Sequence, residues 1–335
     1  MDTLRVADVP EDSGEAAGTR QAGLARRVLG TYGIILVLVA LSLLFGLLSP
    51  VFFSTENILN ILRQVAVVGI VAVGMTFVIL TGGIDLSVGS IIGVASVFMA
   101  KAMLAGMPAA AAVVMTLAMS AVFGLVNGLI VNELFIPPLV ATLGTMTALR
   151  GVAFIISGGL PVFGFSNSLS FLGQGYVWII PVPVVIMAMT FAIGFLLLDA
   201  TRFGRYVYGV GGNEEATRLS GIGVKSIKAL VYTISGFLSG LAGIVLLSRI
   251  DSGQPKAGQG YEMDVITAVV IGGVSISGGE GNIVLVVAGV LIMGVLSNGM
   301  ILLDINEYVQ WVVKGAVLVG AVGFDRVSQQ RKLRA

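Results

Sequence analysis

Long apolar segments follow one another along almost the whole chain, with short polar stretches between them. A helix that crosses the hydrocarbon layer of a membrane needs about 20 predominantly apolar residues, and it must satisfy its backbone hydrogen bonds internally. The expected fold is therefore an all-α polytopic membrane protein. The pattern predicts about ten transmembrane helices, near 30–48, 58–80, 86–101, 108–131, 138–157, 177–198, 227–248, 263–277, 282–299 and 308–324.

The composition strengthens this prediction and excludes several functions. The chain is 56% hydrophobic and only 11% charged, whereas a soluble domain carries about 25% charged residues. It contains no Cys and no His, which removes disulfides, thiolate sites and the commonest metal ligand. No set of residues suited to catalysis stands out, and a net charge of +1 does not suggest nucleic-acid binding. We expect a protein that is not an enzyme and has no cofactor or metal site of its own.

Charged residues gather in three segments, 1–27, 199–228 and 326–335. Lys and Arg accumulate on the cytoplasmic side of membrane proteins, and most of those in this chain fall in the three segments. The sequence thus predicts a cytoplasmic N-terminal tail (1–27), a transmembrane domain (28–325) with a cytoplasmic loop at 199–228, and a cytoplasmic C-terminal tail (326–335). An even number of spans agrees, because both termini then lie inside.

Two glycine-rich segments, 78–89 and 269–279, resemble each other. In each, an apolar helix runs into Gly-Gly, then a short polar stretch, then another apolar helix. Many transporters contain internal repeats and have interrupted helices beside the substrate path, so we expect interrupted helices and a possible internal repeat. The path is predicted to run beside Gly82, Gly83, Gly272 and Gly273. The alternative interpretation is that Gly-Gly merely separates hydrophobic helices.

Two polar residues of the first half are further candidates for this path. Asp85 is the acidic residue most deeply embedded in apolar sequence, and an ionisable group in such a place is costly and often functional. Asp is also a preferred N-cap, so we expect Asp85 chiefly to order a helix start, a role that is compatible with shaping the path. Gln64 lies within a predicted span and either faces the path or makes an interhelical hydrogen bond.

The central loop contains Glu215-Ala-Thr-Arg-Leu-Ser-Gly221, with the spacing Glu-Ala-x-x-x-x-Gly. This spacing resembles the motif with which bacterial importer permeases bind their ATP-hydrolysing subunits. Thr217 stands where the general motif has a second Ala, and Thr is also small. The resemblance implies a short coupling helix in which Glu214, Glu215 and Arg218 make charged contacts, Ala216 and Leu219 insert into the ATPase, and Gly221 turns the chain back toward the membrane.

Together with this motif, further segments resemble the ribose-type permeases of bacterial sugar ABC importers, and the resemblance covers nearly the whole chain. They are 57–64, 74–90, 141–144, 149–151, 204–206, 211–222 and 272–281. The resemblance implies an inner-membrane subunit that pairs with a second permease copy, as a homodimer or with a close paralogue. It also implies an ABC ATPase on the cytoplasmic face, which holds the ATP and Mg, and a periplasmic sugar-binding protein that delivers the substrate.

The function that follows is sugar import by alternating access. Ribose, another pentose, inositol or a related polyol all fit. One alternative is an ion-coupled secondary transporter of a small polar solute, which would normally use embedded carboxylates or His, and this chain offers little beyond Asp85. A second alternative is a membrane scaffold without transport activity.

Overall fold

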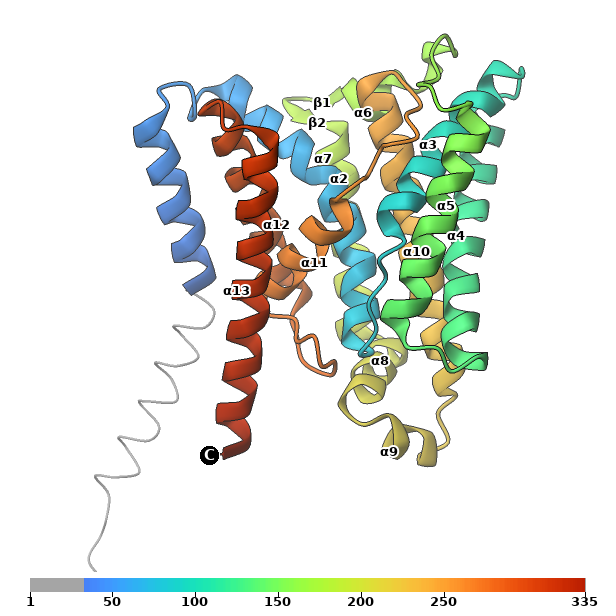
Figure 1. Cartoon of the computed structure of the whole chain (residues 1–335), viewed down its shortest axis with the longest axis vertical. Coiled ribbons are helices and arrows are strands. Elements are labelled where there is room, and N and C mark those ends of the chain that lie inside the picture. Colours follow the sequence, from blue (N-terminus) through green and yellow to red (C-terminus); the bar gives the residue numbers. More distant parts are fainter. Residues whose placement is uncertain (1–32, 335) are drawn as a thin grey trace, which may run out of the picture.

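The computed structural model describes residues 33–334. The tail predicted at 1–27 lies outside these residues. The described part is helical, with one short β-hairpin (Figure 1). Helix Gly33–Leu48 comes first. It is followed by α2 (Thr55–Leu80), α3 (Val88–Leu104), α4 (Ala109–Glu133), α5 (Pro138–Ser157), η1 (Asn167–Leu169), α6 (Ser170–Gln174), β1 (Tyr176–Val177), β2 (Ile180–Pro181), α7 (Val182–Ala200), α8 (Arg202–Gly212), α9 (Glu214–Leu219), α10 (Val224–Ile250), α11 (Tyr261–Ile271), α12 (Ile283–Leu302) and α13 (Glu307–Arg334).

Six helices of the described residues are long and apolar enough to cross a membrane: α2, α4, α5, α7, α10 and α12. The other four predicted spans also coincide with helices, but these do not meet that test. The extreme case is α11, whose 11 residues extend about 16 Å at 1.5 Å per residue. That is roughly half of the ~30 Å hydrocarbon layer. The structure therefore shows an all-α polytopic membrane protein, and it does not confirm ten membrane-spanning helices.

The segment predicted as a C-terminal tail is helical in its described part. Helix α13 runs without interruption to Arg334. The residues after 325 are therefore, up to that point, the last turns of a long helix.

Helices α2 and α10 form the centre of the molecule. In the most apolar 18 residues of α2 and of α10, 83% and 72% are buried, against 22% in each of α4 and α5. Glycines allow α4 to approach α10 closely. A Cβ atom on Gly128 would lie 2.7 Å from the Cα atom of Ala229, and one on Gly124 would collide with the carbonyl oxygen of Tyr232. Small residues at helix contacts are the usual means of close packing in membranes.

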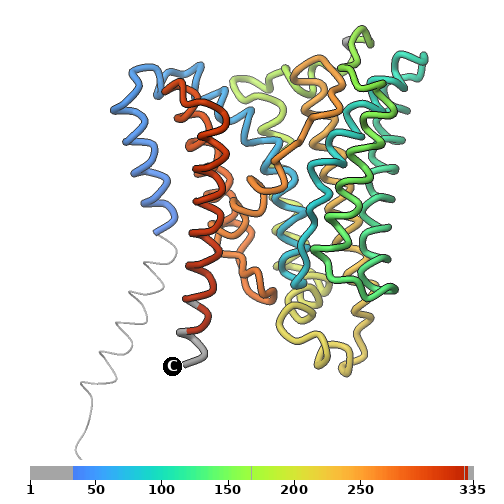
Figure 2. The backbone as a smooth tube through the Cα atoms, in the orientation of Figure 1, coloured from blue at the N-terminus to red at the C-terminus, as the bar shows by residue number. Residues whose placement is uncertain are grey.

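Both central helices are followed by a non-helical segment and then a shorter helix. Residues 81–87 lead from the end of α2 back into the body, where α3 begins midway along the molecule (Figures 1 and 2). Residues 251–260 lead from the end of α10 to α11, which also begins midway. Because α2 and α10 run in opposite directions, the two arrangements are inverted with respect to each other.

This correspondence differs from the predicted one between 78–89 and 269–279. Those segments share a helix ending. Gly83 donates to Val78 and Gly82 to Ile79, in the paired hydrogen bonds of a Schellman motif. In the same way, Val274 donates to Val269 and Gly273 to Val270. The φ angles of Gly82 and Gly273 are +77° and +82°, which glycine adopts without strain. The sequence likeness therefore reflects two helix C-termini.

Candidate coupling surface and translocation path

The short helix α9 stands at one end of the molecule, below α8 and α10 in Figure 1. Its N-cap is Asn213, whose side-chain oxygen accepts a hydrogen bond from the backbone N–H of Ala216 at 2.9 Å. Acidic residues fill its first turn and Arg218 its last, which suits the helix dipole. It ends at Leu219, and the φ of +82° at Gly221 gives the left-handed turn typical of a glycine after a helix. The local sequence thus specifies a helix that stops and turns back at Gly221.

The charged residues of α9 are paired within the chain. Arg218 binds the Glu215 carboxylate with both Nε and Nη2, at 3.0 and 2.6 Å. The hydrogen bond from Arg218, supported by its charge, holds the pKa of the exposed Glu215 carboxyl below its usual value. Glu214 pairs with Lys228 of α10 at 2.6 Å. Glu214 therefore fixes α9 against α10, while the Glu215–Arg218 pair presents its charges to the solvent.

Thr217, which replaces the second Ala of the general motif, has a structural role. Its side chain is 7% exposed, and its hydroxyl donates to the carbonyl of Asn213 at 2.8 Å. It lies against Gly209 of α8, where an added Cβ would be 3.3 Å from the Thr217 Oγ1 atom. Ala216 and Leu219 are exposed, with Leu219 at 73%. The face available to a partner thus excludes Thr217 and contains an exposed leucine.

The glycine segments meet directly behind this surface. We call residues 272–282 the glycine loop. Its Gly279 donates to the Leu80 carbonyl at the end of α2 at 2.9 Å. A Cβ atom on Gly278 would lie 2.8 Å from the backbone nitrogen of Gly82. Tyr208 of α8 donates to Gly281 at 3.1 Å.

The glycine loop also reaches α13, because Ser277 donates to the side chain of Gln329 at 3.1 Å. The loop therefore contacts α2, α8 and α13 at the end of the molecule that carries α9. Of the predicted path residues, Gly82, Gly83, Gly272 and Gly273 all lie in this region.

Asp85 lies deeper and is completely buried. Its Oδ1 atom accepts hydrogen bonds from the N–H and hydroxyl of Ser87, at 3.0 and 2.7 Å. Its Oδ2 atom accepts one from Ser235 of α10 at 2.9 Å. Asn127 of α4 donates to the Ser87 hydroxyl at 2.8 Å. The N-cap of α3 is Ser87 itself, so Asp85 holds the residue at the helix start and does not occupy the cap position.

Gln64 is separated from these residues and lines a small polar cavity of about 60 Å³. Four other polar residues line it, namely Tyr261, Asp264, Ser297 and Lys314. Lys314 of α13 and Asp264 of α11 form an ion pair at 2.7 Å. Such a volume has room for water molecules that bridge polar groups. The cavity thus forms a polar site between α2, α11, α12 and α13.

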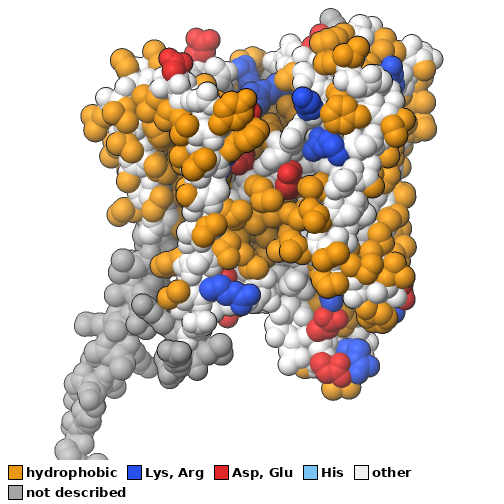
Figure 3. All heavy atoms as spheres, viewed as in Figure 1, with side chains coloured by type: hydrophobic (Ala, Val, Ile, Leu, Met, Phe, Trp, Pro, Cys, Tyr) orange, Lys and Arg blue, Asp and Glu red, His pale blue; other side chains and the backbone are white. Residues whose placement is uncertain are grey.

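Glu262 and Arg150 extend the polar region beside α11. Glu262 is 9% exposed; its Oε1 atom accepts from the Gly260 N–H at 3.2 Å. Its Oε2 atom is buried without a hydrogen-bond partner among the described residues. Arg150 donates to the carbonyls of Pro255 and Ala257, at 3.0 and 2.9 Å. Figure 3 shows a hollow in this face of the molecule, with acidic and basic side chains in its upper half and hydrophobic ones below.

The sequence reasoning did not select Glu262, Asp264 or Tyr261. A signal was present, since Tyr-Glu-Met-Asp directly precedes the apolar residues 265–271. Acidic residues suit the first turn of a helix, and ionisable residues within a membrane body usually face its interior or a water-filled cavity.

Interrupted helices around a polar site in a multi-spanning body, with a charged helix at one end, define a membrane transport component. Residues 57–322 match the family described as branched-chain amino acid transport system / permease component, and the chain belongs to that family.

Characterised relatives carry more specific names. The ribose import permease protein RbsC of Bacillus subtilis is 46% identical over 301 residues, which cover 89% of this chain and 94% of that protein. The L-arabinose transport system permease protein AraH of Escherichia coli is 41% identical, over 91% of this chain and 93% of that protein. The D-allose transport system permease protein AlsC of the same organism is 39% identical, over 89% and 91%. No solved structure matches the chain.

Proposed function

We propose that this chain is the membrane-spanning permease subunit of an ATP-driven importer of ribose or a closely related sugar. The observation that carries the proposal is the extent of similarity to relatives named for ribose, arabinose and allose transport. It reaches beyond the membrane body to the charged helix α9. The same relatives give no support to an ion-coupled transporter.

Three protein partners complete the proposed importer. An ABC ATPase, which supplies the ATP and Mg, docks on α9 through Glu214, Glu215, Ala216, Arg218, Leu219 and Gly221. A periplasmic sugar-binding protein docks at the opposite end. A second copy of the chain forms a homodimer around the pore. The exposed Leu219 and the Glu215–Arg218 pair support the docking role of α9, because they combine an apolar anchor with charges at its edge.

The proposed topology has both termini and α9 on the cytoplasmic side of a bacterial inner membrane. Neither α11 nor 251–260 crosses alone, but together they complete one crossing, as 81–87 and α3 do. These two crossings, helix Gly33–Leu48, α13 and the six long helices make ten. The charges of α8, α9 and the first turns of α10 support this orientation through the excess of Lys and Arg in cytoplasmic loops.

We further propose that the substrate path passes the polar cavity at Gln64 and the hollow beside α11. Sugar hydroxyls need hydrogen-bonding partners in a membrane, and carboxylate, ammonium and amide groups lie there together. The four glycines Gly82, Gly83, Gly272 and Gly273 border the cytoplasmic end of this path, close to α8. Asp85 serves the path indirectly, by holding the start of α3.

The direct test is uptake by vesicles that contain the chain, its ATPase and its sugar-binding protein. We expect vesicles to accumulate radiolabelled ribose only when ATP is present on the side that carries the ATPase. Collapse of the proton and sodium gradients should not affect this accumulation. Unlabelled arabinose and allose, added in excess, then rank the related sugars by competition. Uptake that follows an ion gradient without ATP would contradict the proposal.

A further inference from the structure

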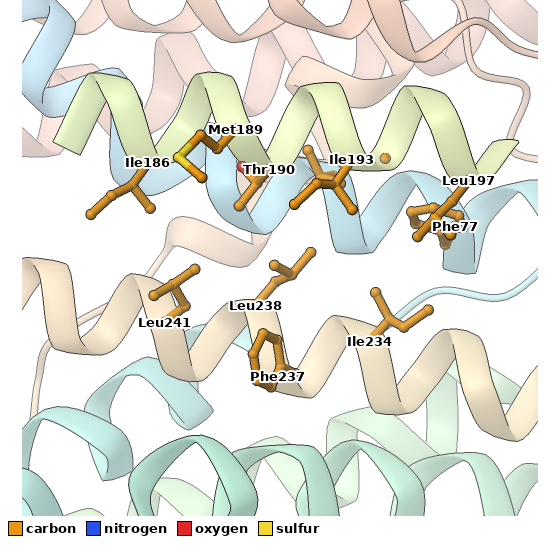
Figure 4. Close-up of a pocket in the computed structure, with 12 residues that line it drawn as sticks. Phe77, Ile186, Met189, Thr190, Ile193, Leu197, Ile234, Phe237, Leu238 and Leu241 are labelled. Atoms are coloured by element: carbon orange, nitrogen blue, oxygen red, sulfur yellow. The ribbon is translucent and has the colours of Figure 1, made fainter. Parts of the chain in front are cut away.

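A groove of about 390 Å³ lies between α7 and α10, apart from both the coupling surface and the polar cavity. Figure 4 shows the side chains of the two helices facing each other across it, with Phe77 of α2 near one end. Its lining contains one polar side chain, Thr190, whose hydroxyl donates to the Met187 carbonyl at 2.7 Å. The lining thus offers no free hydrogen-bond donor, and the groove suits an apolar occupant.

The length and position of the groove match one leaflet of a bilayer. On α7 its lining runs from Ile186 to Leu197, about 16 Å at 1.5 Å per residue. Half of the hydrocarbon layer is about 15 Å. Leu197 is close to the end of α7 at Ala200, so the groove occupies the leaflet next to α8.

The groove also faces away from the proposed substrate path. At about 100° per residue, Val73 and Phe77, which line the groove, lie half a turn around α2 from Gln64 and Val68, which line the polar cavity. Helix α2 therefore separates the two sites. In Figure 1, α7 lies behind α2. The groove side is thus available to lipid when a second copy covers the polar side.

Helix α8, which contacts α2 beside one end of the groove, carries two basic residues. The ring of Phe203 in α8 packs against the ring of Phe77, with centroids 5.9 Å apart. Its neighbours Arg202 and Arg205 are exposed, and neither makes an ion pair or hydrogen bond within residues 33–334; Asp199 forms no ion pair with them. A basic amphipathic helix at a membrane surface attracts anionic lipids.

We propose that the α7–α10 groove and α8 form a binding site for an anionic phospholipid of the leaflet next to α8. One acyl chain lies in the groove, and the phosphate binds Arg202 and Arg205. The charge complementarity decides for a lipid with a negative headgroup, because the groove is uncharged and its end carries two unpaired cations. The site does not depend on which solute is transported.

Native mass spectrometry of the full-length protein, released from detergent with defined lipid, tests the proposal. The probes are palmitoyl-oleoyl phosphatidylglycerol and the phosphatidylcholine with the same chains. Ile193→Trp fills the groove, and its control is Val122→Trp on α4, because both positions are 53% exposed. Arg202→Gln with Arg205→Gln removes the charges, and Lys101→Gln removes an exposed cation elsewhere.

We expect the wild-type protein and both controls to retain phosphatidylglycerol about 30-fold more tightly than phosphatidylcholine, since each basic residue near the surface contributes about 1 kcal/mol. The arginine variant should lose this preference, and the groove-filling variant should lose retention of both lipids. If Ile193→Trp does not yield folded protein, Leu241→Trp fills the groove from α10.

Three results would overturn the site. The groove-filling variants could retain as much lipid as the wild type. The headgroup preference could survive the loss of both arginines. Ile193→Cys, in a chain that otherwise has no cysteine, could cross-link two copies in the membrane, which would show that a second copy covers the groove.

Discussion

Replacing Asp85 tests whether a buried carboxylate holds the interrupted helix in place. Asp85→Leu leaves the Ser87 N–H and the Ser235 hydroxyl without their acceptor in a fully buried site. A buried donor without a partner costs about 1–3 kcal/mol. The Ser235 hydroxyl can turn to a carbonyl of its own helix, whereas the Ser87 N–H is fixed by the backbone. We therefore expect a loss of about 1–3 kcal/mol of stability, set by the Ser87 N–H, and of most of the transport activity.

Asp85→Asn should behave differently. The amide oxygen can still accept from Ser87, and the amide nitrogen can donate to the Ser235 hydroxyl, which is also an acceptor. The buried negative charge is removed as well, which relieves its desolvation cost. We expect stability within about 1 kcal/mol of the wild type, on the same hydrogen-bond scale, and much of the transport retained.

Thermal unfolding of the purified protein in detergent, followed by size-exclusion chromatography, ranks the stabilities, and ATP-driven uptake in vesicles ranks the activities. The matched control is Ser239→Ala, because this buried hydroxyl binds only the Ser235 carbonyl of its own helix. Equal stability of the Leu and Asn variants would refute the role of the hydrogen bonds. A stable but inactive Asn variant would show that the charge itself is needed.

Three further predictions follow from the described contacts. Glu215→Lys or Gly221→Leu should leave membrane insertion intact but sharply lower ATP-driven uptake, measured against the amount of inserted protein, because the first reverses a charge on the docking face and the second strains a residue at φ +82°. Ser220→Cys should react with an impermeant maleimide only from the cytoplasmic side. Gly124→Val should destabilise the protein by about 1–3 kcal/mol through overpacking, because its Cβ meets the backbone of α10, and should lower the unfolding temperature.

Each of these has its own control or contradicting result. Thr217→Ala restores the general motif at a buried position and should keep most uptake, so a loss as severe as that of Glu215→Lys would argue against docking on the exposed face. Labelling at Ser220 from the periplasm would reverse the proposed topology. Gly144→Ala adds a Cβ atom where nothing lies within 4 Å and should leave the unfolding temperature unchanged; a matching loss in both glycine variants would indicate a general effect of helix glycines.

Hydropathy was sufficient to locate the six long apolar helices, because a lipid environment requires each span to be both apolar and internally hydrogen-bonded. Helix α9 could also be predicted from the sequence, since Asn213, the acidic first turn and Gly221 are local signals for a start and a stop. The sequence did not show which interrupted helix of the second half corresponds to which one of the first half. The correspondence between 251–260 and 81–87 becomes visible only in the fold, because the two segments have unlike sequences.

The polar site was predicted only at Gln64, and the acidic residues of α11 were missed for a related reason. Asp264 pairs with Lys314 and Gln64 lines the same cavity, but these residues come from three helices far apart in sequence. Only the burial of each charge, which is a tertiary property, distinguishes them from ordinary residues near a helix end. The two Gly-Gly segments look alike in sequence without being equivalent parts of a repeat. Their likeness arises because the same residues recur wherever a helix ends in glycine.

The glycine loop has a mechanical consequence. Its contacts with α2 and α8 are largely backbone against backbone: Gly279 to Leu80, and Gly278 to Gly82 and Gly211. A side chain can absorb a small displacement by changing rotamer, but a peptide group packed on another peptide group has no such freedom. No rotamer change in these contacts can absorb a small displacement of α8 before it reaches the end of α2. The glycine loop is thus a stiff connection between α8 and α2, and a methyl group added at Gly211, where a Cβ atom would collide with the Leu80 carbonyl oxygen, would require the backbone to move.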